Sequence, residues 1–259
     1  RTVPSHDVDI PHCARRSVRT AALDVVKRRD LQLALKSLSA TADPCDTFDY
    51  LLDQSERRGL TSAFFFMAGV TSPAHDGGYS LDDPRLRALL RRVNDRGHEL
   101  GLHPSYDTFR SPEKIRGELD TLRAACAAEG IEQDTWKGRQ HFLRWENPAT
   151  WRAYEEAGLA ADWSLHFPAH PGFRAGTCFE YPVFDLRARR RLALRELPLI
   201  AMEASFLQYL ALSHDDAYDR MAELKRRCRE VGGTFTLLWH NNRLGTARER
   251  RLYEAVLDA

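Results

Sequence analysis

Short apolar runs alternate along the chain with longer amphipathic segments, and this alternation limits the possible folds more than any other feature. The segment 61–70, TSAFFFMAGV, has the continuous apolar character of a strand buried on both faces. The segments 46–59 and 82–97 carry apolar residues at helical spacing, and each ends at a glycine. Strands that alternate with helices every 30–40 residues (roughly one βα unit) are typical of a mainly parallel sheet. The sequence therefore predicts an α/β fold.

The same pattern continues through the rest of the 259 residues. Further helices are predicted at 111–130, with Ser111 as N-cap, and at 147–158, 215–233 and 247–259. Further strands are predicted at 98–103, 159–165, 179–186, 194–204 and 234–241. Residues 13–46 are less regular and are interpreted as a helical insertion with one basic helix. The number of elements allows either an open sheet or a barrel.

Charge and hydropathy exclude two classes of partner. The formal net charge is +1, from 38 basic and 37 acidic residues, so the chain lacks the basic character of a nucleic-acid-binding protein. No apolar run approaches the roughly 20 residues of a membrane span. Five scattered cysteines without a CxxC pair favour reduced thiols, which predicts a cytoplasmic location. A segment preceding Arg1 in a longer protein remains possible, because the chain opens almost directly on its first acidic strand.

The segment SHDVDIPH, residues 5–12, places two acids at alternate positions. In a strand, Asp7 and Asp9 would point to the same face. Two carboxylates at so short a distance repel each other unless a cation or a shared proton lies between them. This spacing therefore favours a metal ion.

Other predicted strands also end in polar residues. They include His103, Asp162, His240 and the stretch Arg139–His141 that precedes the helix at 147–158. The carboxyl ends of parallel strands gather at one edge of a sheet, where functional residues of such folds lie. Carboxylates and imidazoles are suitable ligands for a divalent metal. We therefore expect a metal site at this edge.

Five segments resemble, in order, the motifs of the polysaccharide deacetylases, which are the NodB-homology or carbohydrate esterase family 4 proteins. GHELGLH resembles the second motif, and SHDVD resembles the first, which is usually Thr-Phe-Asp-Asp-Gly. The other three segments are GRQHFLRW, LAADWSL and TLLWHNN, at 138–145, 159–165 and 236–242. The chain is most similar to a divergent branch that begins with His-Asp-Val-Asp. The resemblance implies one catalytic domain over 1–259, folded as a distorted (β/α) barrel of about seven strands.

The resemblance also implies roles for individual residues. Asp7 matches the general base, Arg139 the arginine that braces it, and His240 the general acid. His103 matches a metal-binding histidine. The family's second acid falls on Val8, which cannot bind metal, so Asp9 is expected to replace it.

The third metal ligand stays open between two residues. The family's second histidine would lie at Asp107, whose carboxylate can bind zinc or can serve in a turn; His141 is the other candidate. The expected cofactor is a divalent metal, zinc before cobalt, nickel or manganese. Substrate contacts are expected from four residues near the motifs: Arg144, Trp145, Trp163 and Asn241.

The predicted function is a metal-dependent hydrolase that removes an N-acetyl group from a sugar or a sugar-containing metabolite. The expected partner is a small carbohydrate or N-acetylated metabolite, with no nucleic acid. One alternative is hydrolysis of another non-peptide C–N bond in an amide. The other is a non-catalytic carbohydrate-binding protein on the same barrel, because the family's usual metal triad is altered.

Overall fold

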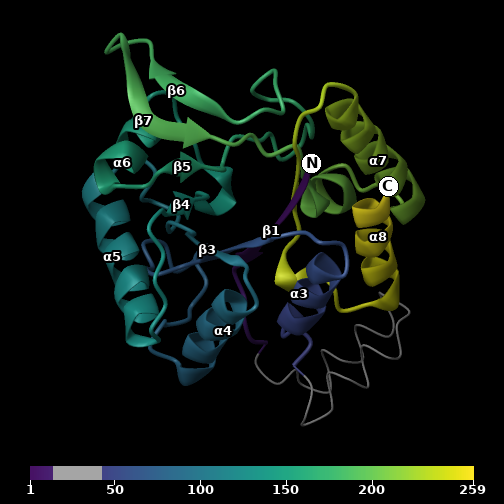
Figure 1. Ribbon diagram of the computed structural model, residues 1–259, viewed down its shortest axis with the longest axis horizontal. Coiled ribbons are helices and arrows are strands. Elements are labelled where there is room, and N and C mark those ends of the chain that lie inside the picture. The colour runs from purple at the N-terminus through teal and green to yellow at the C-terminus, as the bar shows by residue number, and fades with distance from the viewer. Residues whose placement is uncertain (14–42) are drawn as a thin grey trace.

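The computed structural model describes residues 1–13 and 43–259 (Figure 1). The insertion predicted at 13–46 therefore lies almost wholly outside the described residues, and its helix remains a prediction. Among the described residues, no helix is both long enough and apolar enough to cross a membrane.

A nine-stranded sheet forms the centre of the molecule and confirms the predicted α/β class. Its order is β6-β7-β5-β4-β3-β2-β1-β9-β8, and every neighbouring pair is parallel except β6 and β7. The strands are β1 (Thr2–Val8), β2 (Ala63–Phe66), β3 (Glu99–Leu102), β4 (Lys137–Gly138), β5 (Ala161–Asp162), β6 (Tyr181–Asp185), β7 (Arg190–Glu196), β8 (Ala201–Met202) and β9 (Phe235–Leu238). No pairing joins β6 to β8 in the described part of the chain, so the structure shows the strand order without ring closure.

Two features raise the strand number above the seven expected. The segment 194–204, predicted as one strand, contains the end of β7 and all of β8, which lie near opposite ends of the strand order. Pro198 stands between them and has no N–H to donate to a ladder. The two-residue strand β4 was not predicted, because so short an element carries no periodicity.

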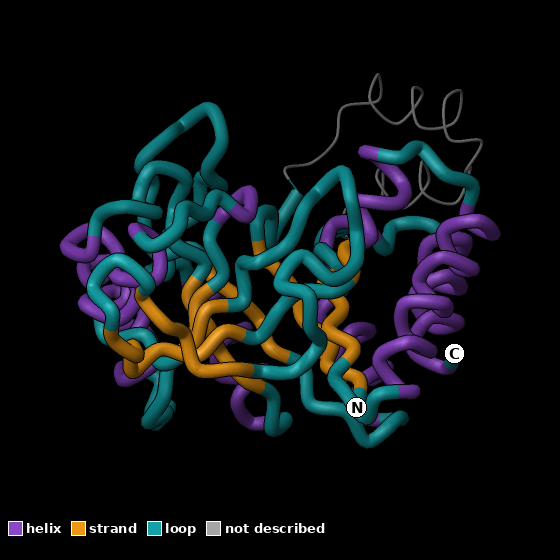
Figure 2. The backbone as a smooth tube through the Cα atoms, turned by 90° about the horizontal axis from the view of Figure 1, so that it is seen from above, coloured by secondary structure: helices purple, strands orange, loops and turns teal. Residues whose placement is uncertain are grey.

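Six described helices surround the sheet, while the hairpin β6–β7 projects from it (Figures 1 and 2). They are α3 (Phe48–Glu56), α4 (Pro84–Asp95), α5 (Pro112–Ala128), α6 (Ala149–Ala157), α7 (His214–Glu230) and α8 (Ala247–Asp258). The side chain of Ser111 accepts a hydrogen bond from the Lys114 N–H, which confirms the predicted N-cap of α5. Thr246 and Glu249 form a capping box at the start of α8.

The aromatic strand β2 separates two packed regions. Phe64 and Phe66 belong to the large cluster that also contains the helix residues, whereas Phe65 packs on the opposite face with Trp163. Asp7 pairs in register with Phe65, so the sheet points Asp7 away from the helices. Gly101 also pairs with Phe65, and a Cβ there would lie 2.6 Å from the phenylalanine ring. Close packing of this inner face therefore requires glycine at 101.

Cys13 and Cys45 form a disulfide, with Cα atoms 5.5 Å apart. The prediction of reduced thiols is wrong for this pair, because a pairing across 32 residues leaves no local sequence signal. The other three cysteines, Cys126, Cys178 and Cys228, are free and buried. Disulfides are typical of oxidising compartments, so this pair removes the support that the cysteine pattern gave to a cytoplasmic location.

Candidate active site

The register of the parallel strands creates the site. Val8 pairs with Phe66, Phe66 with Leu102, and Leu102 with Gly138. The next residues on three of these strands are Asp9, His103 and Arg139, which therefore leave the sheet at one level. On the other side of β1, Leu238 pairs with Ser5 and with Met202, so Glu203 and His240 follow the ends of β8 and β9 near the level of His6 and Asp7. The sheet thus gathers polar side chains at its carboxyl edge.

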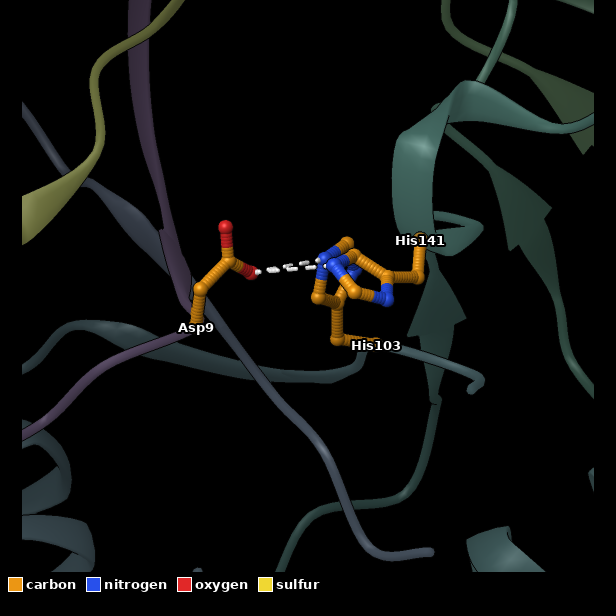
Figure 3. Close-up of side chains that lie close together, drawn as sticks. All are labelled: Asp9, His103 and His141. Carbon is orange, nitrogen blue, oxygen red and sulfur yellow. Dashed lines mark ion pairs between the residues drawn. The ribbon is translucent and has the colours of Figure 1, made fainter. Parts of the chain in front are cut away.

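Asp9, His103 and His141 form a compact group of metal-ligand atoms, all within 4.8 Å of one another (Figure 3). The Nε2 atoms of His103 and His141 lie 3.2 and 3.8 Å from Asp9 Oδ1. The two imidazole rings come from different segments and meet edge to face, with centroids 5.0 Å apart. The prediction that Asp9 lies beside His103 thus agrees with their placement.

The donor set fits a divalent cation. Asp9 Oδ1 is buried and has no hydrogen-bond partner among the described residues. His103 Nδ1 donates to the carbonyl of Arg139 at 2.5 Å, and His141 Nδ1 donates to Asp76 Oδ1 at 2.9 Å. Each histidine is thereby held with the lone pair of Nε2 directed at Asp9, as in metal-binding histidines. One carboxylate and two imidazoles are suitable ligands for zinc and for cobalt, nickel or manganese.

The ionisation of Asp9 also supports a cation site. Burial alone would raise the pKa of Asp9, but the close approach of His103 Nε2 and the positive charge that the surrounding histidines carry when protonated outweigh it and hold the pKa below its usual range. Asp9 is therefore a carboxylate near neutral pH. Burial and the charge of His103 lower the pKa of His141, which keeps this imidazole neutral and able to bind a cation.

Of the two candidates for a third ligand, the structure brings His141 to Asp9. Asp107 instead accepts a hydrogen bond from Arg144 Nη1 at 2.6 Å, and its side chain is 49% exposed. Arg144 also donates to the carbonyl of Tyr106 and stacks over the Tyr106 ring. This pairing holds a loop beside the site and places Arg144 outside the residues that line the cavity.

Asp7 lies beside the metal-ligand group and is held by a buried arginine. Arg139 Nη1 donates to Asp7 Oδ1 at 2.9 Å, while its other donors bond Ser5 Oγ and the carbonyl of Trp163. The guanidinium is fully buried and therefore depends on these partners. The second oxygen, Asp7 Oδ2, faces His103 Nε2 at 3.8 Å. Asp7 is thus fixed with one oxygen directed at the site.

His240 stands on the other side of Asp9 and is oriented by Glu203. The His240 Nδ1 to Glu203 Oε1 distance is 2.6 Å, and His240 Nε2 lies 3.6 Å from Asp9 Oδ2. Burial would lower the pKa of His240, but the carboxylates of Glu203, Asp9 and Asp7 raise it to about 10. His240 is therefore an imidazolium that can donate a proton from Nε2.

A cavity of about 200 Å³ opens over these residues. The carboxylates and histidines form one part of its lining, and the apolar side chains of Leu143, Met202 and Leu238 form another. Phe142 and Leu143 have positive φ angles of 56° and 52°, a conformation that is uncommon for bulky residues. This turn follows His141 directly, and its two residues line the cavity.

None of the four residues predicted to contact substrate lines the cavity, and Arg144 pairs with Asp107 instead. Trp163 is buried and packs on Phe65. Trp145 packs edge to face on Trp151, with ring centroids 4.7 Å apart. Asn241 is fully buried and donates to the carbonyls of residues 10 and 45 at 2.9 and 2.8 Å, so it ties chain segments together. A motif position predicts proximity to a site but does not give the direction of the side chain.

The sequence interpretation missed two residues that orient histidines. Glu203 follows β8 directly, and the strand-end pattern would have found it if β8 had been separated from β7. Asp76 lies in the loop after β2, where it also accepts hydrogen bonds from the N–H groups of Thr71, Ser72 and Tyr106. No spacing in the sequence identifies such a loop carboxylate.

An Asp76→Asn variant is expected to bind zinc about 10- to 100-fold more weakly than the wild type, because His141 loses the charged partner that orients it. Zinc affinity is measured by competition with a chromogenic chelator. Asp107→Asn is the matched control, since Asp107 lies in the neighbouring loop and pairs only with Arg144 among the described cationic groups. Equal affinities for the Asp76→Asn and wild-type proteins would contradict this role.

A second carboxyl pair lies deeper in the fold, at the end of β5 and β7. Asp162 and Glu196 pair in register, and each is fully buried. Trp151 Nε1 donates to one Glu196 oxygen at 2.9 Å, and Ser164 donates to one Asp162 oxygen. The other two oxygens have no partner among the described residues, so one shared proton would satisfy both. Burial raises the pKa of Asp162 to about 6 and raises that of Glu196 as well.

A carboxyl pKa that folding raises stabilises the protein at low pH, and this stabilisation is lost as the pH rises through the folded-state value. The free energy of unfolding of the wild type is therefore expected to fall by about 1–3 kcal/mol between pH 4 and 7 through this pair. Glu196→Gln keeps a neutral partner for Asp162 and should reduce the slope. Urea denaturation at several pH values tests this, with the exposed Glu132→Gln as control. Parallel slopes for the Glu196→Gln variant and the wild type would contradict the shared proton.

No family model matches the chain, and no curated protein matches it either. Solved structures do resemble it. A Mycobacterium smegmatis protein described as a polysaccharide deacetylase aligns over 99% of this chain and 82% of its own, with 15% identity and a TM-score of 0.62. The allantoinase PuuE aligns over 99% and 83%, with 10% identity and a TM-score of 0.59.

A third similar structure is a carbohydrate esterase family 4 pseudoenzyme from Bacillus anthracis, with 8% identity and a TM-score of 0.51 over 99% of this chain and 59% of that one. These likenesses show that the chain has the fold of the NodB and carbohydrate esterase family 4 proteins, as its five motifs predicted. Because that fold occurs in deacetylases, an allantoinase and a pseudoenzyme, it does not by itself decide the reaction.

Proposed function

We propose that the protein is a metal-dependent hydrolase that removes the acetyl group from an N-acetylated sugar or sugar-containing metabolite. The observation that supports this most is the arrangement around one cavity. Asp7, held by Arg139, and His240, held by Glu203, stand on either side of the metal-ligand group Asp9, His103 and His141. A base, an acid and a cation site at one small cavity are the parts that amide hydrolysis requires.

A bound divalent cation would act as a Lewis acid toward water and the acetyl carbonyl. The residues supply the proton transfers. Asp7 accepts a proton from the attacking water through the oxygen that Arg139 leaves free. His240 donates a proton from Nε2 to the leaving nitrogen as the C–N bond breaks. The products are acetate and a free amine, so atoms and charge balance.

The two orienting partners separate the roles of acid and base. Arg139 places a positive charge beside Asp7 and binds one of its two oxygens, which leaves the other oxygen to accept a proton. Glu203 places a negative charge beside His240, which favours the imidazolium form that an acid needs. Two partners of opposite charge therefore orient the base and the acid on either side of the cation site.

The proposal is tested by acetate release from N-acetylglucosamine and its short oligomers, using protein loaded with zinc or cobalt. Turnover that depends on the metal supports it. Allantoin and other small cyclic amides are assayed in parallel for ring opening, because PuuE is an allantoinase of similar fold. Activity on the cyclic amides alone would show that the protein hydrolyses another C–N bond and is not a deacetylase. Metal binding without turnover on either set would favour the non-catalytic carbohydrate-binding alternative.

A further inference from the structure

Arg243 lies in the wall of the cavity, three residues after His240. It ends η3 (Asn241–Arg243), a short 3-10 turn that leads from β9 toward α8. Its N–H donates to the carbonyl of His240 at 3.1 Å, and its own carbonyl accepts from Trp239 Nε1 at 3.2 Å. The backbone of Arg243 is thus fixed from both sides, so its side chain starts from a rigid position beside the general acid.

A neutral side chain supports the guanidinium. Gln208, in the π-turn η2 (Ser205–Tyr209), also lines the cavity. Its amide oxygen, turned toward Arg243, accepts from Nη1 at 2.7 Å, from Nε at 3.1 Å and from Nη2. Among the described residues, no carboxylate lies within 4.0 Å of the Arg243 guanidinium. The other two arginines near the site differ, because Arg139 is paired with Asp7 and Arg144 with Asp107.

The carboxylates around the cavity have partners other than Arg243. Asp7 is paired with Arg139 and Glu203 with His240, and Asp9 belongs to the metal-ligand group. Arg243 is half-buried and contributes a positive charge that none of these carboxylates balances. A partly desolvated arginine that keeps free N–H donors in a cavity wall is suited to binding a ligand anion, and its planar fork fits two oxygens at once.

We propose that Arg243 binds an anionic group of the substrate, so that the enzyme acts on an N-acetylated sugar that carries a carboxylate or a phosphate. This inference rests on the proposed deacetylase function and adds the substrate class to it. Gln208 orients the guanidinium, and the anion binds to the donors that Gln208 leaves free. The acetamide is then directed toward Asp7 and His240, on the same cavity.

The experiment compares three sugars that differ only at C6: 2-acetamido-2-deoxyglucose, its 6-carboxylate (the uronate) and its 6-phosphate. We expect kcat/KM for at least one charged sugar to exceed that for the neutral sugar by about 10- to 100-fold, the range of a charge-assisted hydrogen-bonded pair. The uronate and phosphate arms identify which anion is preferred. The preference should shrink as sodium chloride is raised from 20 to about 500 mM, because salt screens the pairing.

Arg243→Ala is expected to remove the preference, so that the kcat/KM values of this variant for the charged and the neutral sugars become similar. Arg243→Lys should keep part of the preference, because it retains the charge but loses the planar fork. Arg191→Ala is the matched control: it changes the net charge equally, but Arg191 is exposed on β7 and does not line the cavity. A preference that survives in Arg243→Ala, or that disappears in Arg191→Ala, would overturn the assignment.

Failure of the proposed function gives a different result from failure of this inference. If the wild type hydrolyses none of the three sugars, the deacetylase proposal fails for these sugars. The binding affinity of the same protein for each sugar is then measured by titration calorimetry. Tighter binding of a charged sugar that is lost in Arg243→Ala would still support the anion site. Equal binding of all three, or no binding of the charged sugars, would contradict it.

Discussion

Replacement of Asp7 by asparagine is expected to lower kcat for acetate release by about 100- to 10,000-fold, the usual contribution of a general base. The amide cannot accept the proton of the attacking water, although it preserves the size of the side chain. Metal content should stay close to wild type, because the metal-ligand group is formed by Asp9, His103 and His141. The measurements are steady-state kinetics together with metal analysis of the same protein preparation.

Asp107→Asn is the control for this variant, since it makes the same chemical change at an exposed carboxylate near the site. Its kcat should remain within a few-fold of wild type. An Asp7→Asn protein that folds, retains metal and keeps full activity would show that another group is the base. Loss of metal together with activity would instead assign Asp7 to the metal site.

Glu203→Gln is expected to reduce kcat by about 10- to 100-fold and to shift the alkaline side of its pH profile to lower pH, because His240 loses much of its proton-donating form. With Glu203 present, the pKa of His240 is raised to about 10 in spite of burial. Without that carboxylate, burial lowers the pKa, so His240 loses its proton at a lower pH. The glutamine keeps a hydrogen-bonding side chain, which separates the effect of charge from that of position.

The pH profile of kcat is measured for wild type, for Glu203→Gln and for the exposed control Glu132→Gln. A merely structural role for Glu203 would lower kcat equally at every pH. An alkaline limb that does not move relative to wild type would therefore contradict the assignment of His240 as the acid that Glu203 supports.

Much of the fold was predictable because each element carries its own local signal. The triple phenylalanine of β2 and the capped, amphipathic α5 appear at the predicted places. The strand-end rule also predicted that Asp9, His103 and His240 lie at one edge, because parallel register carries the ends of β1, β3 and β9 there. These parts depend on residues that are close in sequence or related by simple strand geometry.

The remaining features depend on contacts that no local pattern encodes. Asp76 reaches His141 from a loop 65 residues away in sequence, and Asp107, the other candidate ligand, pairs with Arg144 instead. The disulfide between Cys13 and Cys45 likewise depends on how the chain returns after 32 residues. In each case tertiary structure, rather than periodicity or propensity, decides where the side chain lies.

The most direct test of the proposed metal-dependent hydrolase is the metal content of protein purified without chelator, measured by inductively coupled plasma mass spectrometry. We expect about one equivalent of divalent metal in the wild type and in Asp107→Ala, as for a single three-ligand site. Asp9→Ala and His103→Ala should each lose it, because each removes a ligand from that site. A wild type that contains no metal and does not bind added zinc, or a His103→Ala variant that retains a full equivalent, would contradict the proposed site.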